Sequence, residues 1–435
     1  MPAVEPNTLV VVLSRESLTG LSIVRSLGQA GFDVDYVSSE PVEGHSKIVA
    51  SSKYVRKTTE LVRKQARTLS LDGTIHDDDL LAALMAYATD QHERRFLFPV
   101  GDDAVAFMDA NKKTLGTLFS MPHLGVAAPF DFLHAMDKEV QGDLAAAAGL
   151  AVPRQWRISL RDDSPVIPKD IEYPVFVKPA TSISGWKIEM ARCDDRSHLK
   201  KHLLWLRKSQ ADRDVLVQGF LDIDEEICLS GVCFGDQVII PAVVRKLRVG
   251  THAKGATITG QLAPTSVLGD ALAKVEALMR SFCFFGMFDM ELHVVGDVAY
   301  FGEVNLRAGG PNYAYLLGGA NVPAACVSGV LAGAGETPRE VADADAAFGP
   351  LDVDPGYFDR TFVVDNVAWD EYISNHISKS ELKHVIGTAD DRLLCRDDDA
   401  APGRLYSDHM QEVSLEKKIK RKVKKGLFDF HIIKS

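Results

Sequence analysis

The stretch from Phe285 to Pro311, FGMFDMELHVVGDVAYFGEVNLRAGGP, constrains the fold more than any other part of the chain. Two short apolar runs each end in a carboxylate, Glu291 and Glu303. Gly296-Asp297 lies between them and is a typical turn signal of a β-hairpin. The pattern therefore predicts two adjacent antiparallel strands, each carrying an acidic side chain.

The polar side chains of this predicted hairpin indicate a metal site. Side chains two residues apart on a strand point to the same side, so Glu303, Asn305 and Arg307 are expected to share one face. If the hairpin brings Glu291 alongside, two carboxylates, an amide oxygen and a guanidinium meet. Hard oxygen ligands without thiol or imidazole suit Mg2+ held beside phosphates. A surface hairpin with solvated charges is the simpler alternative, and it explains the E-x-N-x-R face less well.

Composition narrows the class of protein. A chain of 435 residues with 46% hydrophobic and 25% charged residues predicts a soluble protein of two to four domains. Six scattered cysteines without a C-x-x-C pair argue against zinc and favour a reducing compartment. With no basic leader at the N-terminus, we expect a cytoplasmic location. The net charge of −11 argues against nucleic-acid binding.

The order of apolar patterns predicts an α/β and α+β multidomain protein. A strand at 8–13, a helix up to Gly31 and a second strand form a βαβ opening, so 1–125 is predicted to be a Rossmann-like domain with a parallel sheet. This opening lacks G-x-G-x-x-G, so dinucleotide binding is not inferred. Three further units are expected: 126–208 with a phosphate loop, 209–340 with the metal hairpin on a largely antiparallel sheet, and a C-terminal extension, 341–435.

Three other segments contain residues that suit a binding site, but their sequence patterns are less specific than that of the hairpin. Lys178 ends the predicted strand YPVFVK beside a Gly/Ser/Thr loop and is placed to meet a phosphate, although a solvated lysine is the ordinary alternative. Lys138 lies in a helix predicted over 131–150. Gln218 to Leu221 close a strand ahead of an acidic cluster, which a polar turn would also explain.

The order of these pieces resembles the ATP-grasp superfamily: a helical lysine, V-K-P with a small-residue loop, Q-x-F-L with acids, and E-x(11)-E-x-N-x-R. The resemblance covers about 98–335, and it implies an ATP-grasp fold preceded by the Rossmann-like domain. It implies roles for four groups of residues: Lys138, Lys178, Ser182, Ser184 and Gly185 for the phosphates; Gln218, Phe220, Leu221 and either Glu225 or Glu226 for the nucleoside; Glu291, Glu303 and Asn305 for one or two Mg2+ (or Mn2+); Arg307 and Arg245 for the transferring phosphoryl group.

The resemblance further implies an ATP-dependent carboxylate–amine ligase that forms an amide through an acyl phosphate and releases ADP and phosphate. The chain loosely resembles D-aspartate ligases of peptidoglycan cross-bridges, so an amino acid or a cell-wall precursor is an expected substrate. Two alternatives stay open: a carboxylase or carbamoyl-type enzyme that uses bicarbonate, and a non-catalytic nucleotide-binding protein. The sequence leaves open whether the chain forms a homodimer.

A basic segment at 417–425, KKIKRKVKK, contains seven positive charges and no acid. Leu415, Ile419, Val423 and Leu427 recur every four residues, so a basic amphipathic helix is predicted. One reading is a terminal helix packed on the body. The other is contact with an anionic membrane surface or a lipid-linked substrate.

Overall fold

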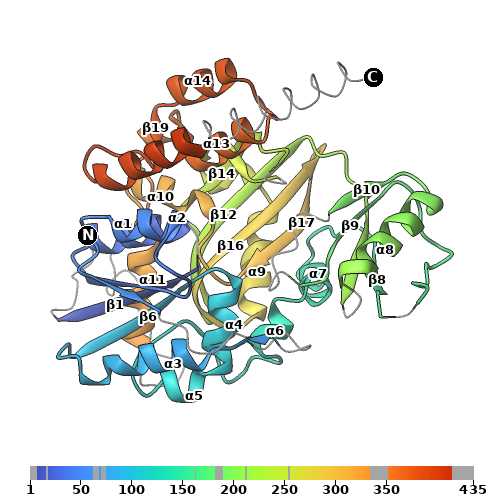
Figure 1. Ribbon diagram of the computed structural model, residues 1–435. Coiled ribbons are helices and arrows are strands. Elements are labelled where there is room, and N and C mark those ends of the chain that lie inside the picture. Colours follow the sequence, from blue (N-terminus) through green and yellow to red (C-terminus); the bar gives the residue numbers. More distant parts are fainter. Residues whose placement is uncertain are drawn as a thin grey trace, which may run out of the picture.

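The computed structural model describes residues 7–413 except 16–17, 62–67, 70–74, 162, 182–189, 211–212, 253–254 and 334–350. Figure 1 shows three sheet-containing units, with the C-terminal extension lying across the N-terminal unit and the large sheet. The basic segment 417–425 and the predicted loop residues Ser182, Ser184 and Gly185 lie outside the described residues.

The N-terminal unit is built on a parallel sheet of strand order β3-β2-β1-β6. Every residue of β1, TLVVVLS, is buried, as expected for a central strand of a parallel sheet covered on both faces. The predicted βαβ opening is therefore confirmed. The elements are β1 (Thr8–Ser14), α1 (Thr19–Gln29), β2 (Asp33–Ser38), α2 (Gly44–Ala50), β3 (Lys57–Glu60), β4 (Thr68–Leu69), β5 (Ile75–His76), α3 (Asp78–Met85), β6 (Arg94–Val100), α4 (Asp102–Ala110) and α5 (Lys112–Leu115).

One predicted helix is divided in two. The sequence predicted a single helix over 131–150, but the structure forms α6 (Phe132–Ala135) and α7 (Lys138–Ala147). Met136 is the C-cap of the first helix, and Asp137 caps the second by accepting a hydrogen bond from the Glu139 amide at 2.9 Å. The break places Lys138 in the first turn of α7, and its backbone amide donates to the carbonyl of Ala180 at 2.9 Å.

A small antiparallel sheet of order β10-β9-β11-β8 forms the second unit, covered by one helix, α8. Its elements are β8 (Gln155–Ser159), β9 (Val175–Pro179), β10 (Ala191–Cys193), α8 (Arg196–Gln210) and β11 (Asp214–Gly219). Since β11 hydrogen-bonds with both β8 and β9, this sheet extends past the unit boundary predicted at 208.

The third unit is a large sheet along the path β17-β16-β12-β14-β15-β18-β19, with β13 and β7 (His123–Leu124) at its sides. Its pairs are antiparallel except β18 with β19, and Val295 opposite Val298 confirms the predicted hairpin turn. The elements are β12 (Glu225–Phe234), β13 (Gln237–Ile239), β14 (Val243–Val249), β15 (Thr257–Ala263), α9 (Ala271–Ser281), β16 (Phe284–Val295), β17 (Val298–Asn305), α10 (Tyr313–Leu317) and α11 (Val322–Gly333).

The C-terminal extension is not a separate body, because it completes the large sheet. It contributes β18 (Thr361–Val363), α13 (Asp365–Ile373), α14 (Lys379–Thr388), β19 (Asp391–Arg392) and a helix at 400–413. One face of the large sheet packs on α7 and α9, and the other packs on α11 and this extension. Among the described residues no single helix suffices to cross a bilayer, although Gly310–Leu317 and Val322–Gly333 together meet the length and composition criteria as a pair bent by 93°.

Candidate functional site

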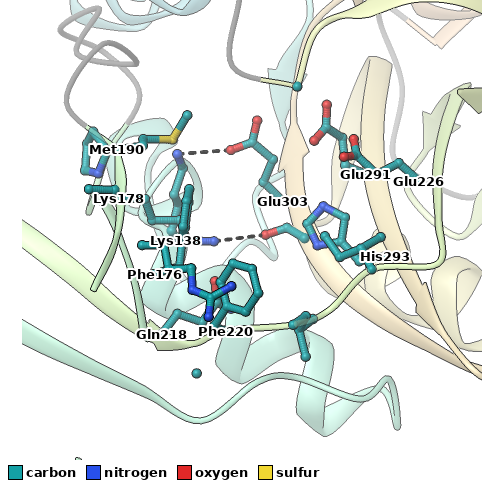
Figure 2. A pocket seen from close by; sticks show the side chains of 18 of the residues that line it. Lys138, Phe176, Lys178, Met190, Gln218, Phe220, Glu226, Glu291, His293 and Glu303 are labelled. Carbon is teal, nitrogen blue, oxygen red and sulfur yellow. Dashed lines mark hydrogen bonds and ion pairs between the residues drawn. The ribbon is translucent and has the colours of Figure 1, made fainter. Parts of the chain in front are cut away.

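A cavity of about 680 Å³ lies between the small sheet and the hairpin end of the large sheet. This volume is within the range of sites for cofactor-sized molecules. Figure 2 shows Lys138 and Lys178 on one side, Glu226 and Glu291 on the other, and Glu303 between them. The cavity therefore combines an ionic region with the more apolar wall described below.

The ionic region arises because one face of the large sheet changes character along its strands. Side chains alternate between the two faces of a strand. On β16, Met287 belongs to the core cluster shared with α11, and the same face continues through Asp289 to Glu291 and His293. On β12 that face ends in Glu226. Apolar side chains thus occur where α11 covers the sheet, and charged ones occur where the sheet meets the cavity.

The hairpin brings Glu291 and Glu303 directly opposite each other on adjacent strands. Immediately beyond this pair the register shifts by one residue, so Gly302 is the extra residue of a β-bulge. A side chain at this position would meet the backbone oxygen of Glu291 at 2.9 Å and the ring of His293 at 3.1 Å. Only glycine fits there, and its carbonyl faces the cavity, where it accepts a hydrogen bond from Lys178 Nζ at 3.3 Å.

Two lysines from different elements converge on this hairpin. Lys138 Nζ lies 3.0 Å from Glu303 Oε2, and the Lys138 side chain is only 7% exposed. Lys178 comes from β9 in the small sheet. Burial, together with the charge of Lys138, lowers the pKa of Lys178 to about 8. At neutral pH the ammonium form of Lys178 is therefore only weakly favoured over the neutral amine until an anion binds beside it.

The opposite end of the cavity is suited to a flat, largely apolar group. Phe176, Phe220, Leu221 and Ile223 line it, together with the Gln218 side chain at a strand end. The guanidinium carbon of Arg192 lies 4.4 Å from the centre of the Phe220 ring, a cation–π contact. An aromatic ring system could stack in this region while a charged portion reaches the lysines.

The structure distinguishes Glu225 from Glu226, between which the sequence did not decide. Glu226 lines the cavity, whereas Glu225 forms an ion pair with Arg245. Arg245 is 47% exposed and is not among the residues that line the cavity, so it is not brought to the predicted site. Its pairing with Glu225 is the physical reason, because the two side chains satisfy each other away from the cavity.

Asn305 and Arg307 lie beside the cavity rather than in its wall. Asn305 Nδ2 donates to Glu303 Oε1 at 3.4 Å. Arg307 Nε pairs with Asp102 Oδ1 at 2.9 Å, at the start of α4, and so joins the hairpin to the N-terminal unit. Burial acts to lower the pKa of Arg307, but the charge and hydrogen bond of Asp102, together with the charges of Asp289 and Glu303, raise it overall.

The sequence analysis missed several residues of the site, among them Phe176 and His293, which line the cavity. Lys246 lies behind the cavity wall, bound to Glu226 and Glu291. Strand alternation could have identified two of them, because Phe176 is two residues before Lys178 and His293 is two residues after Glu291. Burial lowers the pKa of His293, which favours its neutral form at neutral pH.

The donor set fits a hard divalent cation only in part. Glu291, Glu303 and Asn305 offer oxygen ligands of the type that Mg2+ prefers. Among the described residues, however, no group of three His, Cys, Asp or Glu side chains is arranged to hold a metal by itself. Mg2+ usually takes one or two carboxylates plus substrate phosphates. The residues present therefore fit a metal that arrives together with a phosphate ligand.

Comparison with known proteins shows the fold. No family model matches the chain. It is 27% identical over 179 residues to the carbamoyl phosphate synthase large chain of Mycobacterium tuberculosis and 26% identical over 189 residues to that of Streptomyces avermitilis. These matches cover 40% and 42% of this chain but 16% and 17% of those proteins, so the chain matches about one sixth of their length.

Solved structures resemble the chain over a larger share of its length. L-amino acid ligase from Bacillus licheniformis matches with a TM-score of 0.52 over 75% of each chain, at 14% identity. N5-carboxyaminoimidazole ribonucleotide synthetase in its ADP complex matches with a TM-score of 0.55 over 81% of this chain and 80% of that one, at 10% identity. Biotin carboxylase from Campylobacter jejuni matches with a TM-score of 0.53 over 74% of this chain and 70% of that one, at 14% identity. These likenesses confirm the fold class expected from the sequence.

Proposed function

We propose that this chain, which has the ATP-grasp fold of its structural neighbours, is an ATP-dependent ligase that joins a carboxylate to an amine. The observation that carries the proposal is the cavity between the two sheets. Its lysines, its facing carboxylates and its aromatic end match, in order, the phosphates, the metal and the base of a nucleotide. The relatives named above support ligase chemistry in general, and the substrates belong to the proposal.

The lysines and the apolar wall would bind the nucleotide. Lys138 and Lys178 supply ammonium donors to the phosphates, and Gln218, Phe220 and Leu221 surround the base. Between the two acids, Glu226 is proposed to hold the ribose, because it lines the cavity and Glu225 does not. The predicted roles of Ser182, Ser184 and Gly185 stay part of the proposal without structural support.

Glu291, Glu303 and Asn305 would hold Mg2+ once phosphates complete its ligands. The metal would supply neutralisation of phosphate charge. Before a nucleotide binds, the charge of Glu303 is neutralised by Lys138. On nucleotide binding Lys138 would move its contact to a phosphate oxygen while Glu303 turns to the cation. The exchange leaves no charge unpaired in a partly buried site, which is its physical justification.

The reaction would follow in two balanced steps. A carboxylate oxygen of the first substrate bonds to the γ-phosphorus, and the bond to the β-phosphate oxygen breaks, releasing ADP. The amine then bonds to the acyl carbon, the bond from that carbon to the phosphate oxygen breaks, and the departing phosphate takes the proton that the amine loses. Lys138 and Lys178 would orient the triphosphate for in-line transfer. Of the two predicted catalytic arginines we keep Arg307 as a positioning group, since Arg245 pairs outside the cavity.

The expected products are ADP and inorganic phosphate in equal amounts, because an acyl phosphate uses only the γ-phosphoryl group. The test incubates the protein with ATP, Mg2+ and pairs of amino acids, quantifies nucleotides chromatographically and detects the conjugate by mass. Stoichiometric AMP and pyrophosphate would contradict the proposal. Bicarbonate as the only carboxylate tests the carboxylase alternative, which the biotin carboxylase likeness favours. ATP binding without turnover in any mixture would favour the non-catalytic alternative.

Nucleotide affinity is expected to fall as pH rises above about 8, the pKa to which burial and Lys138 lower Lys178. Only the ammonium binds phosphate well, so above this pH binding must first protonate Lys178. The loss approaches tenfold per pH unit, the limit for one required proton. The measurement is the dissociation constant of a non-hydrolysable ATP analogue at pH 7, 8 and 9.

Lys178→Arg is the matched variant, because a guanidinium stays protonated throughout this range. Its affinity should not change with pH between 7 and 9. Equal affinities of the wild type at pH 7 and pH 9 would show that Lys178 does not contact the phosphates.

A further inference from the structure

Lys246 has contacts unlike those of the two lysines that line the cavity. Its side chain is only 2% exposed, and it is not among the lining residues. Its Nζ lies 2.9 Å from Glu226 Oε2, 3.1 Å from Glu291 Oε1 and 3.1 Å from the carbonyl oxygen of Gly255. An ammonium has three N–H donors, so these three acceptors use all of them.

The lining lysines differ in this respect. Within the described part of the chain, Lys138 Nζ contacts Glu303 and Lys178 Nζ contacts the Gly302 carbonyl. Each has further donors for an incoming anion. Lys246 has none to offer and lies behind the carboxylates, so it is poorly placed to become a phosphate ligand.

The position of Lys246 also offsets the repulsion between two neighbouring carboxylates. Glu226 and Glu291 project from adjacent strands on one face, and like charges so placed repel each other. Lys246 contacts one oxygen of each acid and leaves Glu226 Oε1 and Glu291 Oε2 outside its own contacts. Its third bond ties the turn between β14 and β15, at Gly255, to the same two acids.

We propose that Lys246 is a positioning residue, an internal counter-ion that holds Glu226 and Glu291 together and prevents a divalent cation from binding at Glu291 before a polyphosphate is present. With Lys246 on Glu291 and Lys138 on Glu303, neither facing carboxylate attracts a free cation strongly. A bound polyphosphate adds negative charge, and only then does the cation bind well. The proposal rests on the proposed function in that Glu291 is taken as a metal ligand.

The test replaces Lys246 with methionine, which keeps most of the side-chain length without the charge. Mn2+ binding is measured by electron paramagnetic resonance in the absence of any nucleotide. Lys246→Met is expected to bind Mn2+ at least about tenfold more tightly than the wild type, because Glu226 and Glu291 have lost the counter-ion that they share. Adding Glu226→Gln to this variant should remove most of the gain. Lys112→Met, which breaks a surface pair with Asp109, should leave Mn2+ binding unchanged.

A Lys246→Met protein that melts like the wild type but shows no gain in Mn2+ affinity would overturn the proposal. If Lys246→Met does not fold, the single variant Glu226→Gln tests the proposal instead. In Glu226→Gln, Lys246 no longer shares its charge with Glu226, so its full charge acts on Glu291. The affinity of this variant for Mn2+ in the presence of tripolyphosphate should therefore fall at least about fivefold. Tripolyphosphate has no ribose, so the ribose role of Glu226 does not enter, and an unchanged affinity would refute the idea.

These outcomes can be told apart from failure of the proposed function. If the wild type binds no ATP analogue with any divalent cation, the nucleotide site is wrong. The gain in Lys246→Met is measured without nucleotide and does not depend on that result.

Discussion

Replacing Glu303 with glutamine is expected to lower turnover by at least about a hundredfold while leaving nucleotide binding largely intact. A metal contact stabilises the transition state by several kcal/mol, and each 1.36 kcal/mol of lost stabilisation lowers the rate tenfold, so losing this contact slows turnover by the expected amount. Glutamine keeps the volume but removes the charge that neutralises Lys138 at 3.0 Å. Binding of ATP without metal should therefore be no weaker, because Lys138 is freed for phosphate.

This split between binding and turnover distinguishes a metal ligand from a structural residue. The measurements are the rate of phosphate release, ATP-analogue affinity in the presence of a chelator, and the melting temperature. Glu276→Gln is the matched control, because Glu276 pairs with Arg280 on the surface of α9, and it should behave like the wild type. Near-normal turnover of Glu303→Gln at ordinary Mg2+ concentrations would contradict the site assignment.

Removing Arg25 is expected to cost about 3–5 kcal/mol of folding free energy, the usual effect of breaking a buried ion pair. Arg25 on α1 and Asp399 in the C-terminal extension pair at 2.9 Å with side chains 0% and 1% exposed. Arg25 also donates to the carbonyls of Leu393 and Leu394. In Arg25→Met the Asp399 carboxylate stays buried without its cation, and the carbonyls lose their donors.

Denaturant unfolding of Arg25→Met, Asp399→Asn and the double variant measures this effect. The double variant should lose less than the sum of the single losses, because neither charge is then left alone. Arg280→Met breaks the exposed pair with Glu276 and should change stability by no more than about 1 kcal/mol. A loss of less than about 1 kcal/mol in Arg25→Met would show that the extension is not held by this contact.

Local patterns in the sequence were sufficient for much of the fold. The uniformly apolar run at 8–13 and the helix that follows predicted the parallel βαβ opening, because a strand buried on both faces must be apolar throughout. Gly296-Asp297 between two apolar runs predicted the hairpin that sets Glu291 opposite Glu303. Both signals depend on residues close together in the chain, so they need no knowledge of tertiary contacts.

Other features depended on contacts that the local pattern does not contain. The helix predicted over 131–150 is interrupted at Asp137, since the backbone of Lys138 bonds to Ala180 in the small sheet. The bulge at Gly302 shifts the strand register within the hairpin. The C-terminal extension was expected to be separate, yet β18 pairs with β15 in the large sheet. For the helix break and for the extension, the deciding partner lies elsewhere in the chain.

The same division applies to the site. The residue types that could carry the chemistry are evident in the chain alone: lysines at a strand end and in a helix, and a pair of carboxylates on a hairpin. Which charges meet became clear only in the folded molecule, which pairs Arg245 with Glu225 outside the cavity and Lys246 with Glu226 and Glu291 behind its wall. The physical reason is that charge pairing depends on distance in space, and residues 20 or more positions apart become neighbours only when strands assemble into a sheet.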